Sequence, residues 1–359
     1  MSVPVILVSL AILYAAFGLL IAKFGLRGLA CTRTFDRPAV FEGETGEMIE
    51  TVRNDRPMLI PWLRVESRIS PYLQLGGQDN LLVSDRTHAC SLFTLMPFQQ
   101  IRRRHKVAFL RRGAYNLGNA TITVGDPLGA FQSFMEQRMD APLLVYPRLL
   151  DDRELPTPLL SLFGEIASAR NLLTDPFLIR GIRPYQAGDP IRDIHWAATA
   201  RTGETHVRVH DYTAKAKLLV VFNGERKDGQ WSDVLMDYEE TVIEQVIAMA
   251  ATLCSRALGM GLSAGFAANL PIGKENPSTV LLPAASPARE EELLTAFAQL
   301  TIKRTQSFDE LLTSLAQRCE DLDVLVLSRY TNEKIESALQ ALRHSSCRVH
   351  LYPLGGENA

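Results

Sequence analysis

The chain has 359 residues, with 38 lysines and arginines against 40 acidic residues and a formal net charge of −2 at pH 7. This length exceeds the roughly 100–200 residues of a single domain, so it predicts two folded domains and an appendage. A near-neutral charge without a nucleic-acid-reading motif argues against a nucleic-acid-binding protein, and we predict no such partner. The five scattered cysteines form no Cys-x-x-Cys pair, which indicates buried thiols rather than a disulfide framework or a zinc site.

The chain begins with an apolar segment, residues 3–22. At about 1.5 Å per residue, this segment can cross a hydrocarbon core of roughly 30 Å. No basic residue precedes it, whereas Lys23, Arg27, Arg33 and Arg37 follow, so the positive-inside rule places the bulk of the chain in the cytoplasm. We expect residues 1–35 to be a transmembrane anchor and juxtamembrane segment of a single-pass inner-membrane protein, with lipid contacts through residues 3–22.

A cleaved signal peptide is the alternative to an anchor. Such a peptide has a positively charged start and a small-residue cleavage site directly after the apolar run, and this sequence has neither. Gly28–Cys31 is loosely similar to a lipoprotein cleavage box, but Lys23 and Arg27 separate it from the apolar run. The pattern therefore favours an uncleaved anchor.

Residues 36–148 are predicted to form an all-β, sandwich-like domain. Apolar and polar residues alternate along Trp62–Ile69, as in a half-buried strand. Similar short runs recur between turn clusters such as Gly125-Asp126-Pro127, without a long amphipathic helix. The basic run Arg102–Lys106 is predicted to be a solvated strand face; contact with anionic lipid headgroups is the alternative.

Residues 149–212 are predicted to be a connector that contains an unusual stretch, Gly181–Arg201. It contains the charged residues Arg183, Asp189, Arg192 and Arg201. Their spacing fits no simple helix or strand face. Tyr185 and Trp196 lie between them and can stack on guanidinium planes. We interpret the stretch as a polar interdomain joint in which Arg183 and Arg192 hold Asp189 as a charged structural partner.

Two other interpretations of this region remain open. Asp189 and His195 could form a general acid/base pair, which would make the protein an enzyme. His206 and His210 would share one strand face downstream of His195, which allows a metal site to be imagined. We predict neither, and we expect no catalytic residues and no cofactor.

Residues 213–359 are predicted to form a doubly wound α/β domain. The continuous apolar run 218–222 is typical of a parallel strand covered on both faces, and a long helix over about Asp237–Leu258 follows it. Further strand and helix candidates alternate over the rest of the chain, which favours a sheet with helices on both faces.

Three motifs connect the chain to a family. They are Arg111-Arg112-Gly113, Asp126-Pro127-Leu128-Gly129, and the pattern that places Arg183, Tyr185, Gly188, Asp189, Arg192, Trp196, Ala200 and Arg201 at fixed spacings. With the membrane segment and the terminal α/β domain, the chain resembles the domain-of-unknown-function 58 family of bacterial proteins over nearly its whole length. The resemblance implies a C-terminal domain similar to a von Willebrand factor type A domain. It also suggests a partner, because members are often encoded beside MoxR-type AAA+ ATPases.

One departure concerns the metal site of type A domains, where Asp-x-Ser-x-Ser after the first strand supplies oxygen ligands for magnesium. The corresponding stretch here runs from Asn223 through Glu225 to Lys227 and has neither the aspartate nor the serines. Arg226, Lys227 and Arg329 would add repulsive positive charge near a cation. We therefore predict a degenerate site at Asn223, Glu225 and Lys227 that holds no metal, with Glu225 and Asp228 the only residues that could rescue it.

These observations predict a membrane-anchored scaffold or adaptor that presents a protein-binding α/β domain. By resemblance, its partner is a MoxR-type AAA+ ATPase. The alternative is a structural component of an envelope-associated complex without an ATPase partner. An enzyme that uses the Asp189/His195 region is the third possibility.

Overall fold

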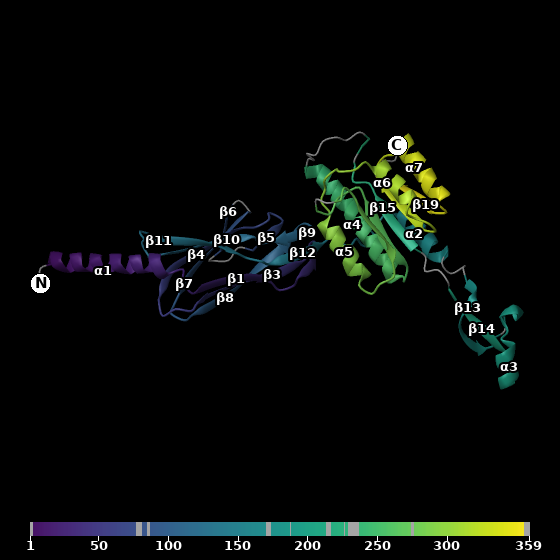
Figure 1. The fold of residues 1–359 in the computed structure, drawn as a ribbon, viewed down its shortest axis with the longest axis horizontal. Coiled ribbons are helices and arrows are strands. Elements are labelled where there is room, and N and C mark those ends of the chain that lie inside the picture. Colours follow the sequence, from purple (N-terminus) through teal and green to yellow (C-terminus); the bar gives the residue numbers. More distant parts are fainter. Residues whose placement is uncertain are drawn as a thin grey trace. The chain divides into compact units, whose positions relative to one another are not determined.

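The computed structural model describes residues 3–76, 81–84, 87–169, 174–186, 188–212, 217–225, 227–228, 237–273 and 276–354. The chain divides into two compact units, Met1–Arg148 and Leu149–Ala359. Figure 1 labels their helices and strands.

The first unit begins with the helix α1 (Val3–Phe24), which is long and apolar enough to be a candidate membrane span. Only its C-terminal part is built into the unit. The side chains of Val3–Leu13 are exposed, whereas Gly18 and Ile21 are buried against the strands that follow. A Cβ atom on Gly18 would lie 2.3 Å from Cδ2 of Phe131, so glycine permits close packing at this point.

The rest of the first unit is a β-sheet body, as the sequence predicted. Its strands are β1 (Leu29–Phe35), β2 (Ala39–Phe41), β3 (Thr45–Asn54), β4 (Ile60–Arg68), β5 (Leu73–Leu75), β6 (Leu81–Ser84), β7 (His88–Leu95), β8 (Gln100–Phe109), β9 (Gly113–Asn116), β10 (Asn119–Gly125), β11 (Gln132–Arg138) and β12 (Pro142–Tyr146). They form sheets in the orders β1-β3-β8-β5, β11-β10-β4-β7-β6 and β2-β12-β9. Pairing is antiparallel except between β12 and β2. Along β4, the residues Leu63, Val65 and Ser67 point into the core between half-buried neighbours, which confirms the predicted period of two.

The basic run on β8 is only partly solvated, which corrects the sequence interpretation. Arg102, Arg104 and Lys106 are exposed on alternate positions, but Arg103 and His105 between them face inward. The Arg103 guanidinium lies 3.9 Å from the centre of the Phe93 ring. Alternation along a strand places one half of any charged run on the inner face.

A buried charge cluster connects this inner face to β1 and β3. Arg33 Nη2 lies 2.6 Å from Glu50 Oε1, and both side chains are fully buried. His105 Nε2 contacts the other Glu50 oxygen at 3.2 Å. Arg33 is therefore part of the core of the β-sheet body, and it does not contribute to the juxtamembrane charge as the sequence suggested.

The second unit contains one five-stranded sheet in the order β17-β16-β15-β18-β19. Its strands are β15 (Lys217–Phe222), β16 (Ser263–Ala268), β17 (Thr279–Ala284), β18 (Asp323–Ser328) and β19 (Arg348–Pro353). All neighbouring pairs are parallel except β16 and β17. The alternation of predicted strands and helices along the sequence did not reveal that the edge strand β17 is antiparallel to β16. A parallel crossover needs a connection of about a dozen residues or more, usually a helix, and no helix is described between β16 and β17.

Helices cover both faces of this sheet. They are α2 (Thr157–Ala169), α4 (Asp237–Gly259), α5 (Arg289–Gln299), α6 (Phe308–Ala316) and α7 (Glu333–His344). Along β15, Leu218, Val220 and Phe222 pack with α2, α4 and α5, whereas Leu219 and Val221 pack with α6 and α7. The run from Leu218 to Phe222 is apolar because both faces of the strand are covered there. The segment α2, which falls in the predicted connector, thus contributes to this core.

The stretch Gly181–Arg201 belongs to a small substructure, called the motif hairpin below. It comprises β13 (Thr174–Pro184) paired antiparallel with β14 (His206–Tyr212), and between them the 3-10 helix η2 (Ile191–Asp193) and the helix α3 (Trp196–Thr202).

Candidate functional site

An ion pair closes the loop that follows β13. Arg183 donates two hydrogen bonds to Asp189, from Nη1 to Oδ2 at 2.7 Å and from Nη2 to Oδ1 at 2.6 Å. The backbone N–H of Gln186 donates to the same carboxylate at 2.8 Å. The bond from Arg183 and the bond from Gln186 lower the pKa of Asp189. A bidentate pair of this kind fixes both distance and orientation across the loop.

Other motif residues complete the interior of the hairpin. Gly188 has a φ of 108°, a conformation that side chains disfavour, so the motif requires glycine there. Ile194 is buried and bridges to the buried Val207. His195 caps α3, because its Nδ1 accepts the N–H of Ala198 at 3.0 Å.

The remaining motif side chains point outward. Trp196 is 67% exposed, Tyr185 is 41% exposed, and Arg201 is also exposed. Two expectations are corrected here. Among the described residues, no guanidinium is found over the ring of Tyr185 or Trp196. Arg192 does not hold Asp189 either; its Nε lies 3.9 Å from Asp193 and its side chain is 86% exposed.

The residues considered for an acid/base pair or a metal site make other contacts in the structure. In the described hairpin, Asp189 is hydrogen-bonded to Arg183 and His195 to the backbone of α3, and the two side chains are not hydrogen-bonded to each other. His206 Nδ1 contacts the carbonyl of Glu204 at 2.7 Å. The His210 side chain lies outside the described part of the chain. Among the residues whose side chains are described, no group of three or more His, Cys, Asp or Glu is arranged to hold a metal.

The residues predicted to form a degenerate metal site begin with Asn223, directly after β15, at the carboxyl edge of the five-stranded sheet. Between β15 and β18 the chain connections change direction, which is where ligands bind in open α/β sheets. Asn223 is buried there and donates from Nδ2 to Ser328 Oγ at 3.1 Å. Its Oδ1 accepts the N–H of Glu225 at 2.9 Å and Nδ2 of Asn269 at 3.3 Å. Amide and hydroxyl groups thus join the ends of three neighbouring strands.

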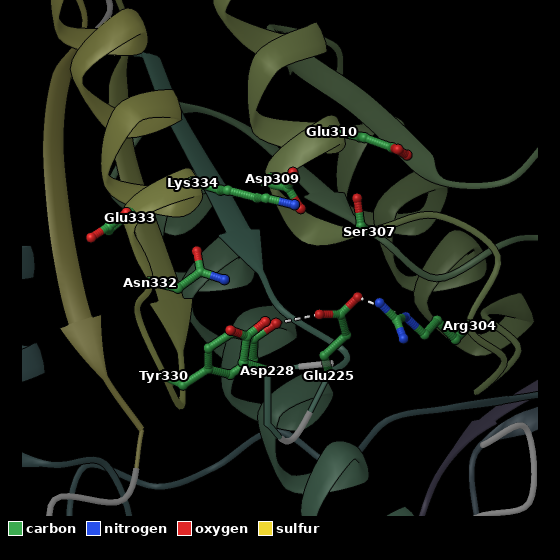
Figure 2. Close-up of a pocket in the computed structure, with 10 residues that line it drawn as sticks. All are labelled: Glu225, Asp228, Arg304, Ser307, Asp309, Glu310, Tyr330, Asn332, Glu333 and Lys334. Atoms are coloured by element: carbon green, nitrogen blue, oxygen red, sulfur yellow. Dashed lines mark hydrogen bonds and ion pairs between the residues drawn. The ribbon is translucent and has the colours of Figure 1, made fainter. Parts of the chain in front are cut away.

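Glu225 follows this network and is held on both sides, as Figure 2 shows. Arg304 Nε lies 2.9 Å from Glu225 Oε1, and the hydroxyl of Tyr330 donates to Oε2. The carboxylate is 4% exposed. Burial and the bond to Glu225 raise the pKa of Tyr330, so its hydroxyl stays protonated as a donor.

This trio lies in an open pocket of about 630 Å³. The other lining residues in Figure 2 are Asp228, Ser307, Asp309, Glu310, Asn332, Glu333 and Lys334. Five of the ten lining residues carry carboxylates and two are basic, so the pocket is acidic. The exposed Lys227 precedes Asp228, and Arg226 lies outside the described residues.

Arg304 and Tyr330 were missed by the sequence analysis, which sought positive charge at Arg226, Lys227 and Arg329. Arg304 is 79 residues away from Glu225 in the chain, and Tyr330 is 105 residues away. The only usable signal was the position of Tyr330 just after a predicted strand, because carboxyl ends of parallel strands share one edge.

Comparison with known proteins supports the family. Residues 181–345 match a protein family described as "Protein of unknown function DUF58". The matched region contains the motif hairpin from Gly181 onward and most of the sheet with its acidic pocket. A search of curated proteins found no match.

Three of the solved structures that are similar to this chain show only weak likeness to it. The CARDB domain of the PF1109 protein from Pyrococcus furiosus is 12% identical, covers 32% of this chain and 90% of its own, and has a TM-score of 0.20. A cohesin of ScaC from Acetivibrio cellulolyticus is 13% identical, with 32% and 99% coverage and a TM-score of 0.22. A GH20 exo-β-N-acetylglucosaminidase from Vibrio harveyi is 10% identical, with 88% and 59% coverage and a TM-score of 0.24. At these scores the likenesses carry no argument about fold or function.

Proposed function

We propose that this protein is a membrane-anchored adaptor that binds a protein partner through its motif hairpin. The exposure of Trp196 carries the proposal. Its motif neighbours Arg183, Asp189 and Ile194 make contacts within the hairpin. The indole of Trp196 at the start of α3, by contrast, is 67% exposed. Tryptophan, tyrosine and arginine are the residue types most enriched at binding hot spots, and Tyr185 and Arg192 are exposed on the same hairpin.

The partner that the family resemblance favours is a MoxR-type AAA+ ATPase in the cytoplasm. In this account residues 213–359 of the second unit form a von Willebrand factor type A-like domain that works without a metal ion. The Arg304 guanidinium supports this role, because it already places a positive charge beside Glu225, the carboxylate of the predicted degenerate metal site.

The anchor is proposed to be uncleaved and to hold the protein at the inner membrane. Packing of α1 supports this, because Tyr14 bonds Asp126 and Ile21 is fully buried in the β-sheet body. Removal of the helix would uncover these contacts. With Arg33 buried, the proposed cytoplasmic orientation depends on Lys23, Arg27 and the exposed Arg37.

Affinity purification of the full chain from native membranes tests the proposal. Wild type, Trp196→Ala and Leu282→Ala are compared with and without ATP; Leu282 is an exposed apolar residue of the same unit outside the hairpin. We expect wild type and Leu282→Ala to recover a AAA+ ATPase in a nucleotide-dependent way and Trp196→Ala to lose most of it. Recovery of envelope proteins alone, unchanged by nucleotide and by Trp196→Ala, would contradict the proposal and favour the structural-component alternative.

A further inference from the structure

The helix α1 is too deeply embedded in its own unit to cross a bilayer as a free rod. From Tyr14 onward it contacts the β-sheet body: the Tyr14 hydroxyl bonds the Asp126 carboxylate, and Gly18 faces the Phe131 ring. The part without such contacts, Val3–Leu13, rises only about 16 Å, roughly half of a 30 Å hydrocarbon core. A full crossing therefore brings part of the β-sheet body into the membrane.

Strand register identifies which part that is. Gly125 at the end of β10 pairs with Trp62 on β4, and Ile60 on β4 pairs with Leu95 at the end of β7. The turns 55–59, 96–99 and 126–131 therefore lie at one end of the body, together with the end of α1. We call these three turns the proximal rim. The C-terminal end of α1 lies beside β11, the strand that follows the last turn (Figure 1).

The proximal rim exposes large apolar side chains that nothing in the described unit covers. Leu128 is 78% exposed, Phe98 is 68% exposed and Met96 is 57% exposed. Phe98 also adopts a φ of 55°, which is unusual for an aromatic residue and holds an exposed turn in a strained conformation. Apolar exposure at several turns of one end is typical of an interaction surface.

Hydrogen bonds make the rim a built structure rather than a set of loose loops. The buried Asn54 donates from Nδ2 to the carbonyls of Met58 at 2.7 Å and Met96 at 3.0 Å, which ties two turns together. In the third turn, Asp126 accepts the N–H groups of Leu128 at 3.1 Å and Phe131 at 2.6 Å. With the Tyr14 hydroxyl as a further donor, this carboxylate is satisfied and only 1% exposed, so it can lie near a bilayer at low cost.

Basic residues also lie at this end of the body. Lys23 and Arg27 lie near the Phe24 ring at the end of α1, and the exposed Arg56 lies beside Gly28. Such residues bind anionic headgroups while apolar neighbours enter the acyl region. We propose that the proximal rim is a lipid-binding surface that is seated in the membrane interface, so that Leu128, Phe98 and Met96 contact acyl chains. This inference rests on the proposed anchoring by α1.

Depth-dependent fluorescence quenching of the full chain in vesicles tests the inference. Cys90, the one half-buried native thiol, is first replaced by serine, since the other four cysteines are buried. A polarity-sensitive fluorophore is then attached at Ile12→Cys in the free part of α1, at Leu128→Cys in the rim, or at Leu110→Cys. Leu110 is the matched control: it is a 49% exposed leucine just beyond the far end of β8.

The vesicles contain phosphatidylcholine, phosphatidylglycerol and a lipid with a doxyl quencher on its acyl chain. We expect strong quenching and blue-shifted emission at positions 12 and 128, and quenching by aqueous iodide alone at position 110. A Met96→Cys probe should behave like position 128.

Each other result overturns the inference in a distinguishable way. If the lipid quencher acts on the probe at position 12 while the probe at position 128 behaves like the one at position 110, the anchor stands but the rim does not contact lipid. No lipid quenching at 12 would remove the anchoring as well. Shielding of 128 from both lipid and aqueous quenchers would show that a protein covers the rim instead.

Discussion

The guanidinium of Arg304 lies against the carboxylate of Glu225, with Nε 2.9 Å from Oε1, at the edge where β15 and β18 end. One fixed cation of the chain itself thus neutralises the carboxylate that sequence reasoning left as a candidate metal ligand. The edge of the pocket is therefore held by an ion pair within the chain, and the contribution of this ion pair to stability can be measured.

Replacement of Arg304 by methionine should destabilise the second unit by about 1–3 kcal/mol, because among the described residues it leaves the buried carboxylate with Tyr330 as its side-chain partner. The double variant with Glu225→Gln should recover most of the loss, since no charge remains buried. Lys334→Met, in the same pocket, is the control and should change little. Hydrogen exchange of the β15 and β18 amides measures the effect; equal protection in wild type and Arg304→Met would contradict it.

Replacement of Asp189 by asparagine should loosen the loop between β13 and η2, because the paired charge is lost while the shape is kept. Since its folded-state pKa is lowered, the clamp is complete above the ordinary value of 3.8 and weakens as the pH falls through the lower folded value. Limited proteolysis of the full chain should show faster cleavage near Gln186 in Asp189→Asn at neutral pH. Cleavage at the wild-type rate would show that the pair does not order the loop.

Glu50 should make the β-sheet body resistant to acid. Burial alone would raise the pKa of Glu50, but the bond from His105 and the charge of Arg33 lower it to about 2. Its contribution, on the order of 3 kcal/mol, is complete above the ordinary value of 4.5 and is lost as the pH falls toward 2. We expect Glu50→Gln to lower the thermal transition of this unit markedly at pH 7 and much less at pH 2. An equal loss at both pH values would assign the effect to packing instead of charge.

Replacement of Gly18 by leucine should push α1 away from the β-sheet body, because even a Cβ atom there would overlap the Phe131 ring. Ala16→Leu places the same side chain on the exposed side of the helix and should be tolerated. Protease sensitivity of the Gly25–Gly28 segment in detergent reports the displacement. Similar cleavage of the two variants would mean that α1 does not pack as described.

The sequence predicted elements better than partners. Alternation along Trp62–Ile69 and the apolar run at 218–222 specify burial directly, because each residue's face follows from its position in the strand. The pairing of Glu225 with Arg304 depends on how strands far apart in the chain align, which local periodicity does not encode. The inward orientation of Arg103 and His105 was not predicted for another reason. A run of like charges suggests a solvated face, although a strand places only alternate residues on that face.

Site-specific photo-crosslinking from position 196 in native membranes tests the adaptor account most directly. A photoreactive residue replaces Trp196 or, as the control, Leu282. The account predicts an adduct with a separate protein at 196, dependent on ATP, and none at 282. An adduct formed only within the chain itself would contradict partner binding and favour the polar interdomain joint.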